Sequence, residues 1–355
     1  MEHHDLYEKL ARYFDQGVIA SPQSPHLIEI LKILFPPDEA AMAVKLPFTN
    51  VPLSQLKDTL PDSAEPLETI FHRMSKRGTV CITRKPGQEP EYRLLPPVVG
   101  WYEAPYAFGR NTDVNRKLAP HWIKYRDDAF GREMARGNMP PMRVIPVSRS
   151  IKDSTGVLPY EIIRPLLEKQ SFCAVTHCSC RGIKQAMDDG CGLSLETCFH
   201  FGSTGRYLAD EGMARPVALD ELPDMLLAAH REGLVHTVDN MAGRLNTICN
   251  CCGCCCIFLE TKNKLGFHTI STSDYVASVD SEACAACGLC EKRCPMHAVG
   301  LFEDSEARVD EARCIGCGVC TPTCPTGAVT LTPRLNAPPL PSMEQFLAAR
   351  YKPMG

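Results

Sequence analysis

Two matching cysteine runs near the C-terminal end have the clearest chemistry in this chain. Residues 284–295 read CAACGLCEKRCP and residues 314–325 read CIGCGVCTPTCP, so each run is C-x2-C-x2-C-x3-C-P. Three thiolates two residues apart wrap a tight loop around one [4Fe-4S] cube, and the fourth thiolate reaches the other cube. Zinc is the alternative, but zinc sites favour two CxxC pairs with a longer gap between them. We therefore expect two [4Fe-4S] clusters in this segment.

The fourth cysteine of each run is expected to serve the opposite cluster. One cluster then has the ligands Cys284, Cys287, Cys290 and Cys324, and the other has Cys314, Cys317, Cys320 and Cys294. Pro295 and Pro325 end the two runs, because proline lacks the N–H that would continue a turn. The segment from about 272 to 333 resembles a bacterial 2[4Fe-4S] ferredoxin module. That resemblance implies a ferredoxin-like fold and the transfer of single electrons.

Ten further cysteines lie in the middle of the chain. Four of them have the spacing C-x-C-x10-C-x6-C, which suits one more cluster or one structural zinc: Cys178, Cys180, Cys191 and Cys198. The run CNCCGCCC supplies the other six: Cys249, Cys251, Cys252, Cys254, Cys255 and Cys256. Neighbouring side chains of an extended chain point opposite ways, so we expect some of this run to face one centre and the rest to face another or to stay free. One or more additional iron–sulfur clusters are predicted, with zinc or redox-active thiols as alternatives, and the two sets could share a centre.

Several residues beside these cysteines could have either a functional or a purely structural role. Arg181 follows Cys180. A guanidinium near a reduced cluster would raise the reduction potential of that cluster. The alternative is an arginine at the surface or paired with a carboxylate, which would leave the potential unchanged. His177 and His200 could be ligands or proton carriers, although packing beside the site is the simpler interpretation. Cys81 and Cys173 stand apart from both sets and are expected to be buried core thiols.

Composition limits the class of protein. The chain has 355 residues, 44% hydrophobic and 23% charged, with a net charge of −4 and 20 cysteines. The beginning, MEHHDLYEKL, has no apolar signal core, and no run approaches the roughly 18 apolar residues of a membrane span. We therefore expect no membrane insertion and a cytoplasmic protein whose thiols bind metal rather than pair with each other. Oxygen-sensitive clusters favour an anaerobic or low-oxygen host.

The first hundred residues predict helices followed by a hairpin. Helices are expected over 26–35, 38–46, 50–60 and 67–76, and TVCITRK and EYRLL form the two strands around a PGQE turn. This order resembles a winged helix. A winged helix usually reads DNA, but residues 1–100 carry 11 Lys and Arg against 13 Asp and Glu, a net of −2. Because phosphate contacts need a basic surface, we do not expect DNA to be a partner, and we favour a packing or docking role.

The predicted fold class is α+β. We expect a winged-helix-like domain (1–105), a helical linker (106–140), a small α/β cysteine-rich domain (141–270), a dicluster ferredoxin domain (271–335) and a C-terminal tail (336–355). In the central domain RVIPV and FCAVTH are predicted strands, PYEIIRPLLEKQ between them is a predicted helix, and ALDELPDMLLAAHREGLVH is a predicted amphipathic helix.

The full order of motifs is similar to a group of anaerobe proteins described as 4Fe-4S dicluster ferredoxin-domain proteins. Cys251-Cys252-Gly253 is also similar to cysteine-rich domains of the heterodisulfide-reductase type, although a second such segment is missing. The resemblance implies electron transfer with a redox partner protein and names no substrate. GxGxxG and Walker motifs are missing, and no catalytic residue is assigned. An electron-transfer protein or subunit is the first hypothesis. An oxidoreductase with a catalytic central site and a cluster-based transcription regulator are the alternatives.

Overall fold

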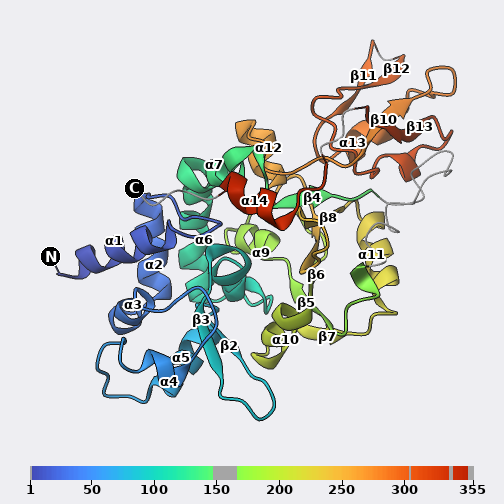
Figure 1. Cartoon of the computed structure of the whole chain (residues 1–355). Coiled ribbons are helices and arrows are strands. Elements are labelled where there is room, and N and C mark those ends of the chain that lie inside the picture. Colours follow the sequence, from blue (N-terminus) through green and yellow to red (C-terminus); the bar gives the residue numbers. More distant parts are fainter. Residues whose placement is uncertain (1, 147–165, 304, 336–338, 351–355) are drawn as a thin grey trace.

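The computed structural model describes residues 2–146, 166–303, 305–335 and 339–350. In Figure 1 the N-terminal helices lie at one side, a cysteine-bearing sheet lies in the middle, and the C-terminal module projects away from both. The chain is a mixture of helices and sheets, so the predicted α+β class is confirmed.

The N-terminal region is a group of helices followed by a small sheet. Its helices are α1 (Glu2–Phe14), α2 (Pro25–Leu34), α3 (Pro37–Ala43), α4 (Leu53–Leu56) and α5 (Leu67–Lys76). Its antiparallel sheet has the order β1-β3-β2, with β1 (Val51–Pro52), β2 (Val80–Thr83) and β3 (Glu91–Leu94). The helices predicted over 26–35 and 67–76 and the hairpin are confirmed. The finer identification as a winged helix stays a prediction.

Helix α1 was not predicted, although its sequence carries the signal. Tyr7, Leu10, Ala11 and Phe14 are all buried, at the i, i+3, i+4, i+7 spacing of a helix face that packs on a core. The Tyr7 hydroxyl donates to the Phe35 carbonyl oxygen at 2.8 Å and so ties α1 to the end of α2.

The segment expected to be a linker lies in the core. A turn at Pro97–Trp101 precedes it and one at Ala104–Tyr106 leads into it, and the segment itself holds α6 (Asp113–Tyr125), α7 (Gly131–Met134) and the turns Arg126–Phe130 and Arg136–Asn138. Trp101 and Trp122 are buried with ring centroids 5.4 Å apart, and Tyr125 stacks on Phe130 at 5.2 Å. Trp101 also contacts Phe14 of α1, with ring centroids 5.2 Å apart, so this aromatic group joins α6 to the N-terminal helices.

The central region is built on a six-stranded sheet of order β4-β8-β9-β6-β5-β7. The strands are β4 (Met142–Val144), β5 (Cys173–His177), β6 (Glu196–Phe201), β7 (Arg215–Val217), β8 (Val235–Asp239) and β9 (Thr247–Cys251). The helices around it are α9 (Ser179–Gln185), α10 (Gly202–Asp210), α11 (Leu222–Arg231) and α12 (Leu259–Leu265). Every paired neighbour is antiparallel, so the sheet is not of the parallel α/β kind.

Two predicted strands of this region are confirmed. RVIPV contributes to β4 and FCAVTH to β5, while the amphipathic helix is α11. The helix predicted over 159–170 falls largely outside the described residues. The antiparallel order differs from the prediction because β6 and β9, which lie inside the cysteine-rich segments, insert between β5 and β8.

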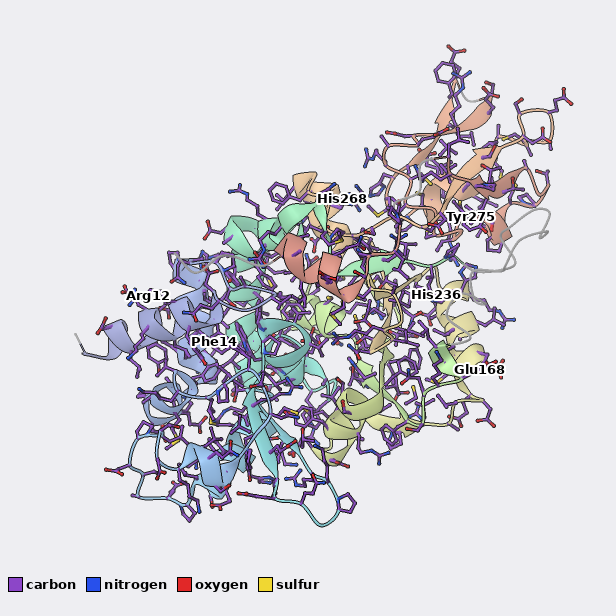
Figure 2. The ribbon with its side chains drawn as sticks, in the orientation of Figure 1. Arg12, Phe14, Glu168, His236, His268 and Tyr275 are labelled. Atoms are coloured by element: carbon purple, nitrogen blue, oxygen red, sulfur yellow. The ribbon has the colours of Figure 1, made fainter. Side chains whose placement is uncertain are left out.

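The C-terminal module contains two small antiparallel sheets. Strand β10 (Tyr275–Val279) pairs with β13 (Val329–Pro333), and β11 (Val299–Phe302) pairs with β12 (Glu306–Val309). Helix α13 (Leu289–Arg293) contains Cys290, the third cysteine of the first run, and a turn at Thr321–Thr323 follows Cys320, the third cysteine of the second. Figure 2 shows Tyr275 in this projecting module and His236 in the central sheet.

The last described segment turns back to the body of the molecule. Helix α14 (Met343–Arg350) lies beside the middle region in Figure 1, and its Arg350 is fully buried. Arg350 donates to the Met139 carbonyl oxygen at 2.8 Å and to Glu133 Oε1 at 3.0 Å. Residues expected to be a tail therefore include a packed helix. Among the described residues, no helix combines the length and apolar character that a membrane crossing requires.

Candidate metal centres and adjoining cavity

The eight cysteines of the C-terminal module sit in two loops that are related by a 30-residue shift. The backbone N–H of Ala307 donates to Cys284 Sγ at 3.4 Å, and the N–H of Ala277 donates to Cys314 Sγ at 3.5 Å. Each loop therefore receives an equivalent N–H from a strand of the module. Hydrogen bonds of this kind stabilise thiolate charge, which is what cluster ligands need.

The fourth cysteine of the first run faces the second loop. Burial raises the pKa of Cys317 to about 12, and the nearest charges that raise it further are those of Cys294 and Cys314. A small cavity of about 20 Å³ is lined by Cys294 together with Cys314, Cys317 and Cys320. This is the grouping expected for a crossed fourth ligand.

The backbone of the second loop is compact because of Gly316. Its φ is +67°, and a Cβ there would overlap the Tyr275 carbonyl oxygen and Ser273 Oγ. Ser273 Oγ also donates to the Gly316 carbonyl oxygen at 2.7 Å. Only glycine fits this close approach without strain.

Six of the ten central cysteines form a closed group, which we term the six-thiol ring. Each thiol has two others of the group as hydrogen-bonding neighbours, in the order Cys178, Cys180, Cys256, Cys251, Cys249, Cys198 and back to Cys178. Strand pairing assembles the ring. The register that pairs Phe199 with Ile248 brings β6 and β9 side by side, and Cys249 and Cys251 share one face of β9 because strand side chains alternate.

The other four central cysteines form a separate group, which we term the four-thiol set. The Sγ atoms of Cys191, Cys252, Cys254 and Cys255 all lie within 4.8 Å of one another. Cys254 and Cys255 are 3.7 Å apart. The CNCCGCCC run thus serves two groups, as predicted. Cys191 lies with Cys252, Cys254 and Cys255 and not with the C-x-C pair whose motif it was expected to complete.

Arg181 lies between the two groups. It is 2% exposed and donates to the Asn250 carbonyl oxygen at 3.1 Å and to Thr197 Oγ1. Burial lowers its pKa, but the charges of Cys178 and Cys198, with a smaller contribution from Cys252, outweigh burial and raise it. In the part of the chain that the structure describes, no carboxylate forms an ion pair with Arg181. The anions that balance this buried cation are therefore thiolates of both groups.

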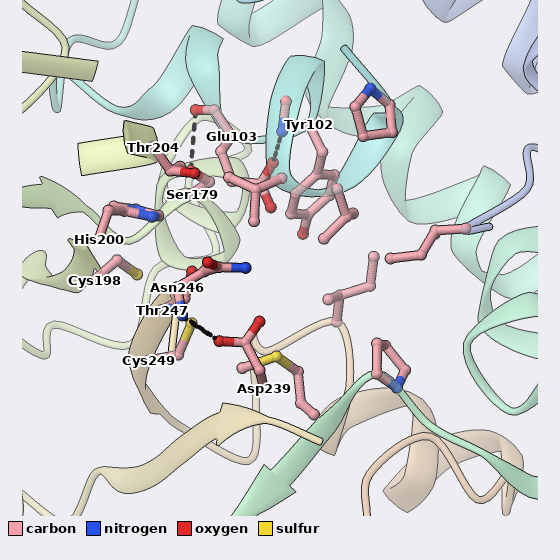
Figure 3. A pocket seen from close by; sticks show the side chains of 18 of the residues that line it. Tyr102, Glu103, Ser179, Cys198, His200, Thr204, Asp239, Asn246, Thr247 and Cys249 are labelled. Atoms are coloured by element: carbon pink, nitrogen blue, oxygen red, sulfur yellow. Dashed lines mark hydrogen bonds between the residues drawn. The ribbon is translucent and has the colours of Figure 1, made fainter. Parts of the chain in front are cut away.

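A cavity of about 570 Å³ opens beside the six-thiol ring. All six ring thiols line it, and its wall also includes the Tyr102–Glu103 segment, the β8–β9 connection, helix α14 and residues of α10 and of the N-terminal region. Figure 3 shows Cys198, Cys249 and His200 along one side of the cavity, with Tyr102 and Glu103 facing it from a neighbouring segment. The volume falls in the range of small-molecule sites.

Proton-carrying side chains accompany the thiols in this cavity. The Tyr102 hydroxyl donates to Cys180 Sγ at 3.3 Å. Burial raises the pKa of Glu103 to about 8, although the Gly100 N–H donates to its Oε2 at 2.7 Å and offsets part of that effect. Burial also raises the pKa of Asp239 and lowers that of His200 to about 4. At neutral pH the cavity therefore contains a protonated carboxyl and a neutral imidazole.

Sequence reasoning did not find Tyr102, Glu103 or Asp239 as cavity residues. No spacing links them to the cysteine motifs, because they approach the thiols only through the fold. Of the two histidines singled out, His200 lines the cavity. Cys81 and Cys173 are 4% and 1% exposed and pack in apolar clusters, so their prediction as core thiols is confirmed.

The C-terminal module contacts the central region next to the four-thiol set. Asn263 Nδ2 donates to the Pro295 carbonyl oxygen at 2.9 Å and to the Gly253 carbonyl oxygen at 3.4 Å. A Cβ on Gly253 would overlap the Pro295 carbonyl oxygen. Pro295 directly follows Cys294, and Gly253 directly follows Cys252. The cysteine groups of the two regions therefore meet through one tight backbone contact.

Comparison with known proteins locates one domain. Residues 283–328 match the family model described as a 4Fe-4S dicluster domain. No curated protein matches the chain. The match covers both cysteine runs, and four of the central cysteines form a group able to hold a metal ion. The chain is therefore an iron–sulfur protein whose C-terminal module is a 4Fe-4S dicluster domain suited to electron transfer.

Proposed function

We propose that this protein is an iron–sulfur oxidoreductase in which the dicluster domain supplies or removes single electrons at a central cysteine-ligated centre. The observation that carries the proposal is the 570 Å³ cavity, whose wall contains the whole six-thiol ring. A cluster held by the ring would itself occupy part of this cavity, and a relay that only passed electrons onward would need none of the space that is left. Here the space, the thiols and the proton carriers lie together.

The six-thiol ring fits an iron–sulfur centre by its donor chemistry. Thiolates are the ligands that such clusters use, and the buried Arg181 stabilises thiolate charge on Cys178 and Cys198. A cluster held there would accept and release one electron at a time. Six thiols exceed the four that one cube needs. The ring therefore has spare sulfur donors on the side that lines the cavity.

The chain's own residues can handle protons beside that centre. Tyr102 donates to Cys180 and so fixes one thiol of the ring. The pKa of Glu103 is raised to about 8, because burial disfavours the charged carboxylate, so Glu103 retains its proton at neutral pH. Ser179 Oγ donates to the Glu103 carbonyl oxygen at 3.0 Å and holds this segment against the start of α9. A substrate that gains an electron in the cavity would thus find a proton donor nearby.

Electrons would enter through the contact between Pro295 and Gly253. We expect the cluster held by Cys314, Cys317, Cys320 and Cys294 to be the nearer one, because Cys294 adjoins that contact. The cluster held by Cys284, Cys287, Cys290 and Cys324 would then exchange electrons with a soluble redox partner.

Anaerobic purification followed by metal, sulfide and EPR analysis tests the proposal. The dicluster domain accounts for about eight irons, so about twelve or more per chain are expected. The central signal should change when small oxidised compounds are added, while the two dicluster signals stay constant. A preparation with about eight irons and no central signal would contradict the proposal.

A pure electron carrier is the second candidate, and the dicluster match favours it. The two candidates differ in what the cavity does. When a reduced dye supplies the electrons, an oxidoreductase should oxidise the dye at a rate that depends on the small compound added. A carrier should oxidise the dye at the same rate with every small compound, and faster only when a protein acceptor is added.

A transcription regulator is less well supported. Arg73 on α5 and Arg77 directly after it pair with the buried Glu39, and Lys76 at the end of α5 pairs with Glu211 of the central region at 3.3 Å. Basic side chains held this way are poorly available to phosphates. We expect no sequence-selective binding in gel-shift assays with the upstream DNA at about 150 mM salt, and nanomolar binding would favour the regulator instead.

A further inference from the structure

We propose that Cys191, Cys252, Cys254 and Cys255 bind a single zinc ion, separate from any cluster at the six-thiol ring. Their four Sγ atoms lie within 4.8 Å of one another. Thiolates at about 2.3 Å from one tetrahedral zinc ion stand about 3.8 Å apart, which these four can reach with small adjustments. Cys254 and Cys255 are already at 3.7 Å.

The compactness of the set argues against a cube. The four ligands of a [4Fe-4S] cluster bind four different iron atoms at the corners of the cube, so their sulfurs must stand further apart than ligands sharing one ion. Three of the four thiols also come from a single tight turn, with Gly253 between Cys252 and Cys254. A turn of that size closes around one ion, and Cys191 completes the tetrahedron from another segment.

The surroundings supply the charge balance that such a site requires. A zinc ion with four thiolates carries two negative charges. Arg181 reaches Cys252 from the side of the six-thiol ring, so one buried cation serves both groups.

Zinc, rather than a redox metal, fits the position of the site. Residues 188–195 contain no helix or strand, and Cys191 lies in the middle of this segment. Structural zinc ions with four cysteines commonly fasten such irregular segments. The ion would tie the segment to the 252–255 turn, against which Pro295 of the dicluster domain packs. It would therefore hold the docking surface of that domain in shape without carrying electrons.

Metal analysis of the full chain tests the inference independently of the proposed function. The anaerobically purified protein should contain one zinc per chain besides its iron. Cys191→Ser and Cys254→Ser should each lower the zinc content at least about tenfold and leave the iron content and the dicluster EPR signals unchanged. Cys81→Ala, which removes a buried thiol outside both groups, should change neither metal.

Cobalt provides a second measurement on the unaltered chain. Protein produced with Co²⁺ in place of zinc should show the visible bands of tetrahedral cobalt with four thiolates, and Cys254→Ser should weaken them. Loss of iron instead of zinc from Cys191→Ser, or a mononuclear iron in place of zinc, would overturn the assignment. So would cobalt-grown protein without those bands. Absence of iron from the six-thiol ring would contradict the proposed oxidoreductase function but would not contradict the zinc site.

Discussion

The dicluster domain and the central region use cysteine in opposite ways. In the dicluster domain eight thiols lie in two short runs, repeat after 30 residues and receive matching backbone N–H donors from Ala277 and Ala307. In the central region ten thiols come from segments some 50 residues apart, and the pairing of β6 with β9 brings them together. One arrangement is local and repetitive, and the other depends on the whole sheet.

The difference also extends to the space beside the thiols. The second loop of the dicluster domain encloses about 20 Å³, whereas the six-thiol ring borders about 570 Å³. A local loop can wrap a cofactor tightly and leave no room for a second molecule. Such a site suits the exchange of electrons, which needs no bound substrate. Ligands carried by separate strands and turns can instead form one wall of a cavity whose other walls come from distant elements. We infer that the two regions divide the work between electron delivery and chemistry.

The strongest test of this division removes the C-x-C pair. Cys178→Ser with Cys180→Ser breaks the six-thiol ring at two adjacent positions, so the central EPR signal and any turnover should be lost. The two dicluster signals should be nearly unchanged, because each cube has four thiolates of its own. EPR and dye oxidation before and after the change provide the measurement. A double variant that keeps every signal and full turnover would mean that the ring has no redox role.

The crossed ligand assignment inside the dicluster domain comes next. Cys294→Ala should damage the cluster whose other ligands are Cys314, Cys317 and Cys320, since Cys294 lines the same small cavity. Roughly half of the dicluster signal should disappear, and electron entry to the central region should slow sharply. Comparison with Cys324→Ala, the equivalent position of the second run, should show loss of the other signal. Loss of the 284–290 centre from Cys294→Ala would disprove the crossing.

The contact between the two regions can be loosened without touching a ligand. Gly253→Ala places a Cβ against the Pro295 carbonyl oxygen, so the dicluster domain must shift away. Electron transfer falls steeply with distance, and we expect a slowing on the order of tenfold with iron content unchanged. Stopped-flow reduction of the central centre measures it. Gly300→Ala, where a Cβ would meet only Glu291 Oε1 at 3.7 Å, is the matched control, because neither Gly253 nor Gly300 has a positive φ.

The same contrast explains what the sequence could predict. The dicluster domain could be identified because its ligands are fixed by spacing in two runs, and helices such as α5 could be predicted because their apolar period is local. That CNCCGCCC faces more than one direction was predictable from strand alternation, although β9 ends at Cys251 and alternation covers only Cys249 and Cys251. The partition itself was not, because Cys191 and Cys198 are separated by the start of β6. Tyr102 and Glu103 end the segment PPVVGWYE and Asp239 ends β8, but no spacing ties them to the cysteines, and only the packing of distant segments brings them to the cavity.

Arg181 offers a gentler change at the boundary between the six-thiol ring and the four-thiol set. Arg181→Met removes a buried positive charge near Cys178 and Cys198, so the reduced, more negative form of the centre becomes less favourable. We expect its potential to fall by on the order of tens of millivolts, with metal content retained. Arg181→Lys keeps the charge and should recover much of the difference. Redox titration followed by EPR decides, and an unchanged potential in Arg181→Met would show that thiolate charge is balanced elsewhere.

The smallest expected effect concerns the proton on Glu103. Its pKa is raised from 4.5 to about 8, first of all by burial, so between these values the folded protein holds a proton that the unfolded chain releases. Stability is therefore full below about pH 4.5 and decreases as pH rises toward 8. Glu103→Gln cannot lose a proton and should lack this decrease. Between pH 6 and 8 the wild type should lose roughly 1–2 kcal/mol relative to Glu103→Gln.

Anaerobic thermal unfolding at both pH values measures the difference, and Glu311→Gln, at an exposed position, controls for the removal of a carboxylate. Equal pH dependence in wild type and Glu103→Gln would show that Glu103 is ionised in the folded protein, and the cavity would then have to obtain its proton from another group.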